Sequence, residues 1–255
     1  MTPSLLLNHF YVTPDRSTFE AAEGSDSLSR FGALEKRTTL RKDATYTGLY
    51  LYGERTYLEL LHPESTSFGA PSGIAYGVEE EGALEEIARG IPAPKIDLVS
   101  RGEVAWFRRC LSQQPLEGLA EWVMEYVPPF FRGFHPDLPP DRPGIARADA
   151  LTRYVAACGQ LERRSDGLFE DVVALEVALA PNDHARWKAR ALRMQDVALG
   201  VSVAASGAPT GIFAAHLRLR RDAGKSVEQI GSTTLSLDGR SAVWHFQKGS
   251  HGQLS

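Results

Sequence analysis

The sequence has little of what defines several large classes of protein. It contains two cysteines in 255 residues, Cys110 and Cys158, too few for a disulfide framework and typical of a reduced protein. No apolar run approaches the roughly 18 residues of a membrane-spanning helix. The 28 Lys and Arg residues are outnumbered by 32 Asp and Glu, which disfavours a nucleic-acid-binding surface. We therefore predict a cytoplasmic protein that binds neither membranes nor nucleic acids.

Linear motifs of common enzyme classes are absent as well. The sequence contains no glycine-rich nucleotide-binding loop, no Gly-x-Ser-x-Gly motif and no Cys-x-x-Cys pair. No Lys or Arg precedes the first short apolar run, residues 5–7, so no signal peptide is predicted. These absences disfavour dinucleotide-dependent, serine-hydrolase and thiol-redox chemistry. We therefore expect the functional residues to come from separate positions along the chain rather than from one linear motif.

Turn-forming residues are abundant, with 23 Gly and 15 Pro. They divide residues 1–127 into two units with the same predicted order, a strand, a helix and three strands. In residues 1–64 we expect strands at 5–12, 34–40, 46–52 and 56–61, and a helix within 16–31 that is interrupted or ends near Gly24. In residues 72–127 we expect strands at 73–78, 95–99, 104–111 and 119–127, and a helix at 80–90. The repeat predicts an α+β fold in which tandem βαβββ modules form an open, mostly antiparallel, barrel-like sheet.

The second half of the chain begins with a proline-rich segment. Residues 128–165 hold a long loop, with six prolines between 128 and 145, and a helix at 146–161. Residues 166–248 predict a third βαβββ-like module, and residues 249–255 form a polar tail. The third module is expected to have a helix at 183–194 and strands at 171–179, 197–204, 212–219, 233–237 and 242–246.

Short patterns on two strands of each unit resemble the metal-ligand positions of the vicinal oxygen chelate superfamily, which includes glyoxalase I, fosfomycin-resistance enzymes and extradiol dioxygenases. His9 lies on the first strand and Glu59 on the fourth, in Tyr-Leu-Glu-Leu-Leu. In the second unit Glu125 lies on the fourth strand, and Gly73 takes the remaining position. The resemblance covers residues 5–127 and extends to uncharacterised bacterial glyoxalase-like proteins. It implies a divalent metal (Zn, Mn, Fe, Ni or Mg) held by His9, Glu59 and Glu125, with one position vacant.

The residues themselves give a physical reason to consider this site. Because side chains alternate along a strand, Leu7, His9 and Tyr11 are predicted to share one face. Each candidate carboxylate likewise has apolar neighbours on its own face, which is costly unless the charge is paired or binds a cation. Small residues at positions 73, 75 and 77 would leave room for a substrate. Taken singly, however, a strand histidine is more often a core or surface residue, and a strand glutamate a solvated one.

The resemblance implies a metal-dependent enzyme of lyase, isomerase or dioxygenase type. Its substrate would be a small oxygenated metabolite that chelates the metal through adjacent oxygens. Glu121 is the candidate base, Tyr11 and Tyr57 are candidate hydrogen-bond donors to the substrate, and residues 128–136 are the candidate lid. The alternative is a non-catalytic protein that binds or sequesters a small aromatic molecule. The vacant position at Gly73 and the aromatic residues of the strands favour that alternative.

The third module carries a second pair of candidates. Aligning it with the first module places Glu176 opposite His9, and His245 opposite Glu59. We favour a structural role for this module, in which it covers the edge of the barrel or forms the surface of a homodimer.

Overall fold

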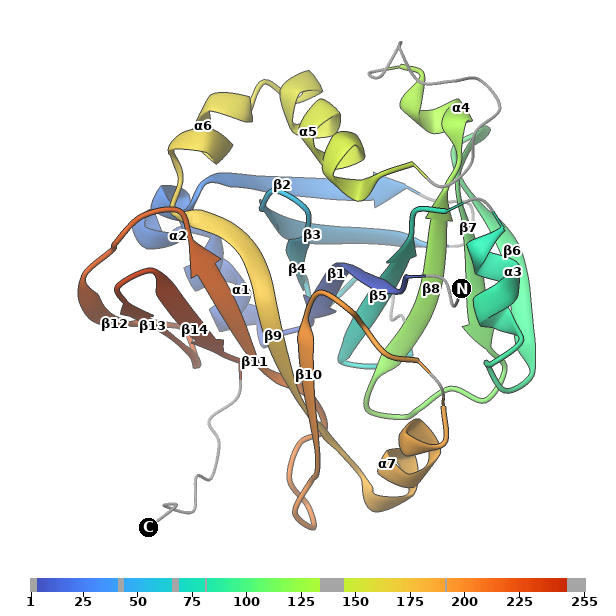
Figure 1. Cartoon of the computed structure of the whole chain (residues 1–255). Helices are drawn as coiled ribbons and strands as arrows, with labels where there is room; N and C mark the ends of the chain where they lie inside the picture. The colour runs from blue at the N-terminus through green and yellow to red at the C-terminus, as the bar shows by residue number, and fades with distance from the viewer. Residues whose placement is uncertain are drawn as a thin grey trace.

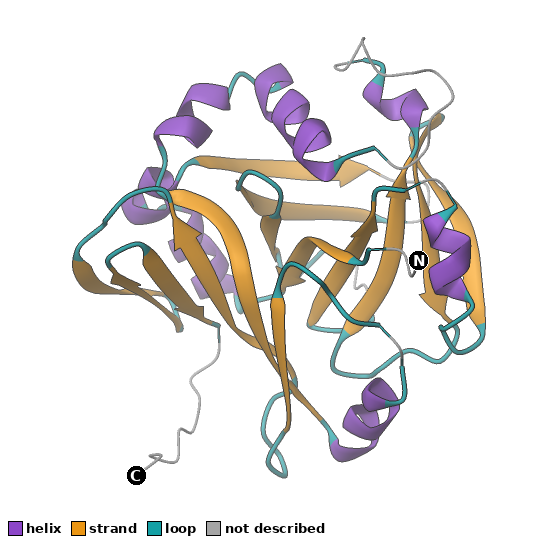
Figure 2. Ribbon diagram, viewed as in Figure 1, coloured by secondary structure: helices purple, strands orange, loops and turns teal. Residues whose placement is uncertain are grey.

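The structure is a computed structural model that describes residues 4–40, 44–65, 69–80, 82–133, 145–190 and 192–246. Two β-sheets pack against one another, and short helices cover their edges and faces (Figures 1 and 2). The α+β class predicted from the sequence is confirmed. No helix in the described ranges is long and apolar enough to cross a membrane.

Sheet A is curled and has eight strands in the order β2-β3-β4-β1-β5-β8-β7-β6. In each half the first strand pairs in parallel with the fourth, β1 with β4 and β5 with β8. The two first strands, β1 and β5, pair antiparallel at the middle of the sheet. The two halves are thus related by an approximate two-fold arrangement, as the repeated order of elements predicts. The strands are β1 (Leu6–Val12), β2 (Ala33–Leu40), β3 (Thr45–Tyr52), β4 (Tyr57–Leu61), β5 (Ser72–Val78), β6 (Pro94–Arg101), β7 (Val104–Ser112) and β8 (Ala120–Tyr126).

The central strands are buried on both faces. All residues of β4 and β5 are buried, and so are six of the seven residues of β1. This burial fits their nearly continuous apolar runs, since a strand covered on both sides has no need of polar alternation. One face of these strands contacts sheet B, and the other lies inside the curl of sheet A.

Helices of the first two modules lie on the side of the core. The predicted helix at 16–31 is divided at Gly24 into α1 (Arg16–Glu23) and α2 (Asp26–Phe31), as the glycine indicated. Asp15 caps α1 by accepting a hydrogen bond from the Thr18 backbone N–H at 2.8 Å. The second module has α3 (Ala83–Ala88), which lies against β7 and β8.

The proline-rich segment starts with a short helix, α4 (Pro128–Phe131), rather than with a loop. Residues 134–144 lie outside the described residues, and most of the predicted loop and the distal part of the predicted lid fall there. The predicted helix at 146–161 corresponds to α5 (Arg147–Ala157), followed by α6 (Leu161–Asp166). Two residues of α5, Leu151 and Val155, pack with tyrosines of β3 and β4 and close one end of the curl.

Sheet B has six strands in the order β10-β9-β11-β14-β13-β12. It begins as predicted with a strand, a helix (α7, Pro181–Lys188) and a second strand. However, β9 pairs in parallel with β10 directly, so its connectivity differs from that of the first two modules. The edge strand β12 is not predicted from the sequence, because it is mostly polar and exposed and so lacks an apolar alternation. The strands are β9 (Phe169–Leu179), β10 (Ala198–Val203), β11 (Gly211–Leu219), β12 (Lys225–Ile230), β13 (Thr233–Asp238) and β14 (Ser241–His245).

Sheet B and the outer face of sheet A share one hydrophobic core, to which β1 contributes Phe10 and β14 contributes Trp244. A buried carboxylate, Asp171 of β9, also joins the sheets. It accepts hydrogen bonds from Arg55 Nε at 2.8 Å and from Thr56 Oγ1 at 3.0 Å, both in the β3–β4 turn region. The third module therefore supports the strands of the first module from behind.

Candidate functional site

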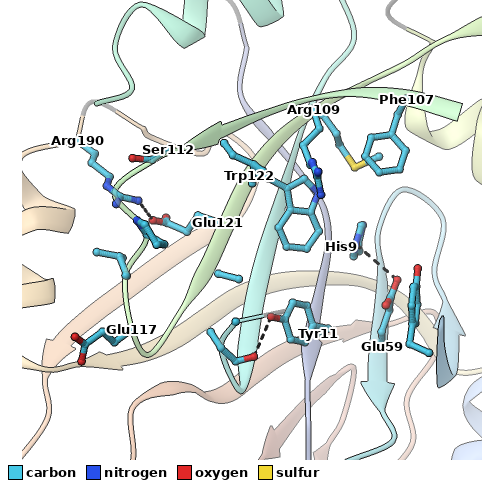
Figure 3. A pocket seen from close by; sticks show the side chains of 18 of the residues that line it. His9, Tyr11, Glu59, Phe107, Arg109, Ser112, Glu117, Glu121, Trp122 and Arg190 are labelled. Carbon is cyan, nitrogen blue, oxygen red and sulfur yellow. Dashed lines mark hydrogen bonds and ion pairs between the residues drawn. The ribbon is translucent and has the colours of Figure 1, made fainter. Parts of the chain in front are cut away.

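A cavity of about 500 Å³ lies inside the curl of sheet A (Figure 3). This volume is typical of sites for small organic molecules. Side chains from β1, β3, β4, β7 and β8 line it, together with the loops that follow β4 and β7 and one arginine just after α7. The lining is rich in aromatic rings, which belong to Tyr11, Tyr46, Tyr57, Trp106, Phe107 and Trp122.

A β-bulge at Asn8 directs His9 into this cavity. The register with β5 shifts between Leu7 and His9, so that Leu7 lies opposite Tyr76 and His9 opposite Ala75. Leu7 consequently packs in the core between the sheets, whereas His9 faces the cavity. The prediction that Leu7, His9 and Tyr11 share one face is therefore wrong for Leu7. A bulge of this kind is a common device for re-aiming a side chain at a functional site.

His9 is held as a neutral imidazole. Its Nδ1 lies 2.8 Å from Asn8 Oδ1, and because an amide oxygen only accepts hydrogen bonds, Nδ1 carries the proton. Burial, with a smaller contribution from the positive charge of Arg37, lowers the pKa of His9 to about 3. The ring stacks on Tyr57 at 4.4 Å and meets the edge of Trp122 at 5.5 Å between ring centroids. Its Nε2 lone pair is left to face Glu59.

Glu59 is a buried carboxyl group, only 7% exposed, at the floor of the cavity. Its Oε1 lies 3.6 Å from His9 Nε2, which is longer than a hydrogen bond. Burial raises the pKa of Glu59 to about 7, and the charge of Arg37 opposes part of that rise. Burial thus keeps His9 neutral, whereas Glu59 changes between its neutral and ionised forms near pH 7.

The two tyrosines predicted as hydrogen-bond donors also line the cavity. Tyr57 lies directly opposite His9 in the sheet, and its ring covers the imidazole. The Tyr11 hydroxyl donates a hydrogen bond to the Ala70 carbonyl oxygen at 3.0 Å, so it is engaged by the loop after β4. The Tyr11 ring crosses Gly73, where an added Cβ would lie 2.3 Å from Tyr11 Cε1.

The structure changes the interpretation of Gly73. In the register of the two first strands Ala75, not Gly73, lies opposite His9, and Gly73 lies opposite Tyr11. The glycine is needed because the Tyr11 ring fills the space that a side chain would take. The volume predicted at position 73 is therefore occupied by the protein itself.

Glu125 does not join His9 and Glu59. Trp122 and Met124 of β8 face the cavity, so Glu125 points to the other side of the sheet, where it is completely buried. There its Oε2 accepts a hydrogen bond from Arg108 at 2.8 Å. Arg108 also forms an ion pair with Glu85 of α3. An ion pair, rather than a metal, accounts for this carboxylate among apolar neighbours.

The predicted metal ligands do not fit a metal centre in the described part of the chain. His9 Nε2 and Glu59 Oε1 are two donors, whereas protein metal sites usually have three or more. No group of three or more His, Cys, Asp or Glu side chains that could hold a metal ion occurs among the residues in the described ranges. The equivalent positions in the second half of sheet A carry no donors. Ala75 lies opposite His9, and Trp122 pairs with Ala75 as Tyr57 pairs with His9, so Met124, which has no nitrogen or oxygen donor in its side chain, matches Glu59.

Glu121, the candidate base, lines the cavity near Ser112 (Figure 3). Its carboxylate is held by two partners, Arg190 at 2.5 Å and the Tyr76 hydroxyl, which donates at 2.7 Å. Burial raises the pKa of Glu121, while these two partners favour its ionised form. Its position in the cavity agrees with the prediction, but the partners make it a fixed part of the wall.

Sequence reasoning missed two arginines of the cavity. Arg109 forms two hydrogen bonds with Asp97, at 3.0 and 2.9 Å, and Arg190 reaches the cavity from the third module. The alternation along β7 placed Phe107 and Arg109 on one face and could have indicated Arg109. No local signal marks Arg190, because its partner Glu121 is 69 residues away in the sequence.

The candidate pair of the third module does not form. Glu176 Oε1 lies 2.6 Å from His216 Nε2 rather than beside His245, and both residues of this ion pair are partly exposed. His245 lies opposite Ala214 in the sheet. None of these residues lines the cavity of sheet A.

One comparison with known proteins identifies a family. The model of a family described as "Family of unknown function (DUF5829)" matches residues 7–246. No curated protein matches the chain. The match includes both sheets, so the three modules belong to a single family unit.

Proposed function

Because the chain belongs to this family of unknown function (DUF5829), we propose its function from the cavity: the protein binds a small organic molecule with a flat apolar body inside sheet A. The observation that carries the proposal is a cavity of about 500 Å³ whose wall is largely aromatic and whose floor holds His9 and Glu59. Aromatic walls favour flat ligands, and a few polar groups at fixed positions orient them.

The floor of the cavity supplies the orientation. A ligand N–H or O–H would donate to His9 Nε2, whose lone pair is fixed by the hydrogen bond from Nδ1 to Asn8. Glu59 would accept a hydrogen bond when ionised and donate one when protonated, since its pKa of about 7 allows both states. The ligand body would lie against Trp106 and Trp122.

The test is a binding measurement with a cavity-filling variant. A panel of small bicyclic aromatic molecules is titrated into the protein while the tryptophan fluorescence is followed, to which Trp106 and Trp122 of the cavity contribute. We expect saturable 1:1 quenching that Ala120→Phe abolishes, because Ala120 lines the cavity. The matched control is Ala198→Phe, on an exposed position of β10 outside the cavity. Equal binding by Ala120→Phe and the wild type, or no binding by any member of the panel, would contradict the proposal.

An enzyme that uses the same ligand is the second candidate, and the paired His9 and Glu59 favour it. A carboxyl group with a pKa of about 7 can act as a general acid or base near neutral pH, and the neutral His9 imidazole, whose pKa is lowered to about 3, would accept a hydrogen bond beside it. In such an enzyme Glu59→Gln would abolish turnover and retain the binding of neutral ligands. The metal-dependent lyase, isomerase or dioxygenase predicted from the sequence is tested separately, by the metal content of protein purified without added metal.

The proposal also includes membership of the vicinal oxygen chelate superfamily and a cytoplasmic location. The tandem βαβββ arrangement, with parallel first and fourth strands in each half, supports the resemblance to the vicinal oxygen chelate superfamily. Both cysteines are free, Cys110 in the interior and Cys158 at the surface, which supports a cytoplasmic location.

A further inference from the structure

The charged groups that line the cavity do not balance. The cations are Arg109 and Arg190, and each is matched by an acid. Arg109 makes two hydrogen bonds with Asp97, and Arg190 lies 2.5 Å from Glu121. Neither arginine therefore offers uncompensated positive charge to a ligand.

Two carboxylates are left over. Glu59 is 7% exposed and faces the cavity, and within the described ranges it forms no ion pair with Lys or Arg, while His9 Nε2 lies 3.6 Å away. Glu117 is exposed at the rim and forms no ion pair among the residues that the structure describes. Figure 3 shows Glu117 and Glu59 on opposite sides of the cavity, with Tyr11 and Trp122 between them.

Arg37 is the arginine whose charge acts on Glu59, but it does not line the cavity. Arg37 lines a separate, smaller cavity next to α5. It lies 3.3 Å from Glu35, and its guanidinium carbon is 4.0 Å from the centre of the Tyr50 ring. Its charge is thus already shared with an acid and an aromatic face, and Arg37 is not among the residues that line the main cavity.

The aromatic rings of the cavity also favour a cationic ligand over an anionic one. Six of them line the cavity, and the face of an aromatic ring carries partial negative charge that attracts a cation. An anionic ligand would lose its hydration and meet no unmatched cation among the described lining residues, which is costly. A cation would meet a buried carboxylate and several aromatic rings.

We propose that the ligand of this cavity is an organic cation, an amine or a quaternary ammonium group on a flat apolar body, with its positive charge at Glu59. This inference rests on the proposed binding function and specifies its ligand class. The cationic nitrogen lies beside the Glu59 carboxylate, and the N–H of an amine donates to His9 Nε2. Glu117 attracts the cation to the mouth of the cavity.

The test uses three ligands of one shape and different charge. Calorimetric titrations at pH 8 compare 1-naphthylmethylamine, which is cationic, with the neutral 1-naphthylmethanol and the anionic 1-naphthoate. We expect the amine to bind about tenfold more tightly than the alcohol, as a desolvated cation next to aromatic rings and a carboxylate should, and the carboxylate to bind most weakly. Equal or tighter binding of the alcohol or of the carboxylate overturns the inference and leaves the proposed function intact. Binding of none of the three by a folded protein overturns both.

Variants of the two carboxylates test which of them causes the preference for the amine over the alcohol. Glu59→Gln should remove most of the preference for the amine over the alcohol, and Glu117→Gln should reduce it by about twofold, because the charge of Glu117 is exposed and screened. Glu103→Gln, in the exposed turn between β6 and β7, is the matched control and should have no effect. An unchanged preference in a folded Glu59→Gln variant contradicts the assignment. If that variant does not fold, the three wild-type titrations still decide the ligand class.

Discussion

The two halves of sheet A have the same strand order and pairing, yet only one of them supplies proton-exchanging groups to the centre. The first half places His9 and Glu59 there, and the second has Ala75 and Met124 at the matching positions. Trp122 in the second half corresponds to Tyr57 in the first, and the two rings flank His9. The two halves of a repeated scaffold can thus have different roles, since one half provides polar groups and the other provides space and an apolar wall.

The carboxylates of the two halves differ in the same way. Glu59 is buried and has no cation in direct contact among the described residues, whereas Glu125 is buried beside Arg108. A carboxylate that is kept without a partner costs stability and is retained only where it has another use. An ion-paired carboxylate is explained by structure alone.

The largest expected effect is a pH-dependent gain in stability in Glu59→Gln. Burial raises the folded-state pKa of Glu59 to about 7 from an ordinary value of 4.5. Ionisation in the folded protein is therefore disfavoured, and the stability present below pH 4.5 is lost as the pH rises through 7. At pH 9 the variant should be more stable than the wild type by about 3 kcal/mol, at 1.36 kcal/mol per pKa unit. The two should be similar at pH 4.5.

Denaturant unfolding of both proteins between pH 4.5 and 9 measures this difference. His9 changes wild type and variant alike, because its lowered pKa costs stability as the pH falls from 6.5 toward 3. The difference between the two proteins isolates Glu59. A constant difference across this range would show that Glu59 has an ordinary pKa.

A second prediction concerns the contact between the halves at Tyr11 and Gly73. In Gly73→Ala the new Cβ would lie 2.3 Å from Tyr11 Cε1 and 3.0 Å from the Ala120 carbonyl oxygen. We expect a loss of about 2 kcal/mol, as for other overpacked core positions, together with weaker ligand binding. Gly77→Ala on the same strand is the control, since its Cβ would come no closer than 3.4 Å to Asn8 Cβ. Equal stability of the two variants would contradict the close approach of Tyr11.

A smaller effect of opposite sign to that at Glu59 is expected in the second half. Glu125→Gln removes the charge that faces Arg108 and should destabilise the protein by about 1.5 kcal/mol near neutral pH, with no gain at high pH. The loss is limited because Arg108 is partly exposed and keeps its ion pair with Glu85. Thermal unfolding of Glu125→Gln beside Glu59→Gln compares the two halves directly. A stabilised Glu125→Gln would mean that this carboxylate too is held without compensation.

The smallest expected effect is that of a chelator. Only one half of the sheet carries donors at the centre, so the melting temperature of protein purified without added metal should be unchanged by excess EDTA. A bound metal would stabilise the native state, and its removal would lower the melting temperature. A decrease would restore the metal-dependent enzyme predicted from the sequence and show that a further ligand completes the site.

Much of the fold could be predicted because it depends on local patterns. The repeated order of strand, helix and three strands gave the two modules, and Gly24 marked the break in the first helix. The mostly polar strand β12 was not predicted, because an exposed edge strand needs no apolar alternation. The parallel pairing of β9 with β10 was not predicted either, since the pairing of two strands depends on both and cannot be read from the sequence of one.

The site was predicted only in part, for reasons of geometry. Alternation along a strand shows which side chains share a face, but not which face becomes the inside of the sheet. Glu125 was predicted to have apolar neighbours on its own face, and that face is the outer one, where Val123 packs in the core. On β1 the bulge at Asn8 broke the alternation itself, so Leu7 and His9 lie on opposite faces.

The sequence by itself determined the strands and helices of the two modules and brought forward His9, Glu59, Tyr11, Tyr57 and Glu121, all of which line the cavity. These inferences needed only residue spacing and a family resemblance. Tertiary structure decided which carboxylate received a cation and which did not, because Arg108 reaches Glu125 across a strand pair and Arg190 reaches Glu121 from the third module. Charge compensation depends on distances of a few ångströms between segments far apart in the chain, and only the folded molecule sets those distances.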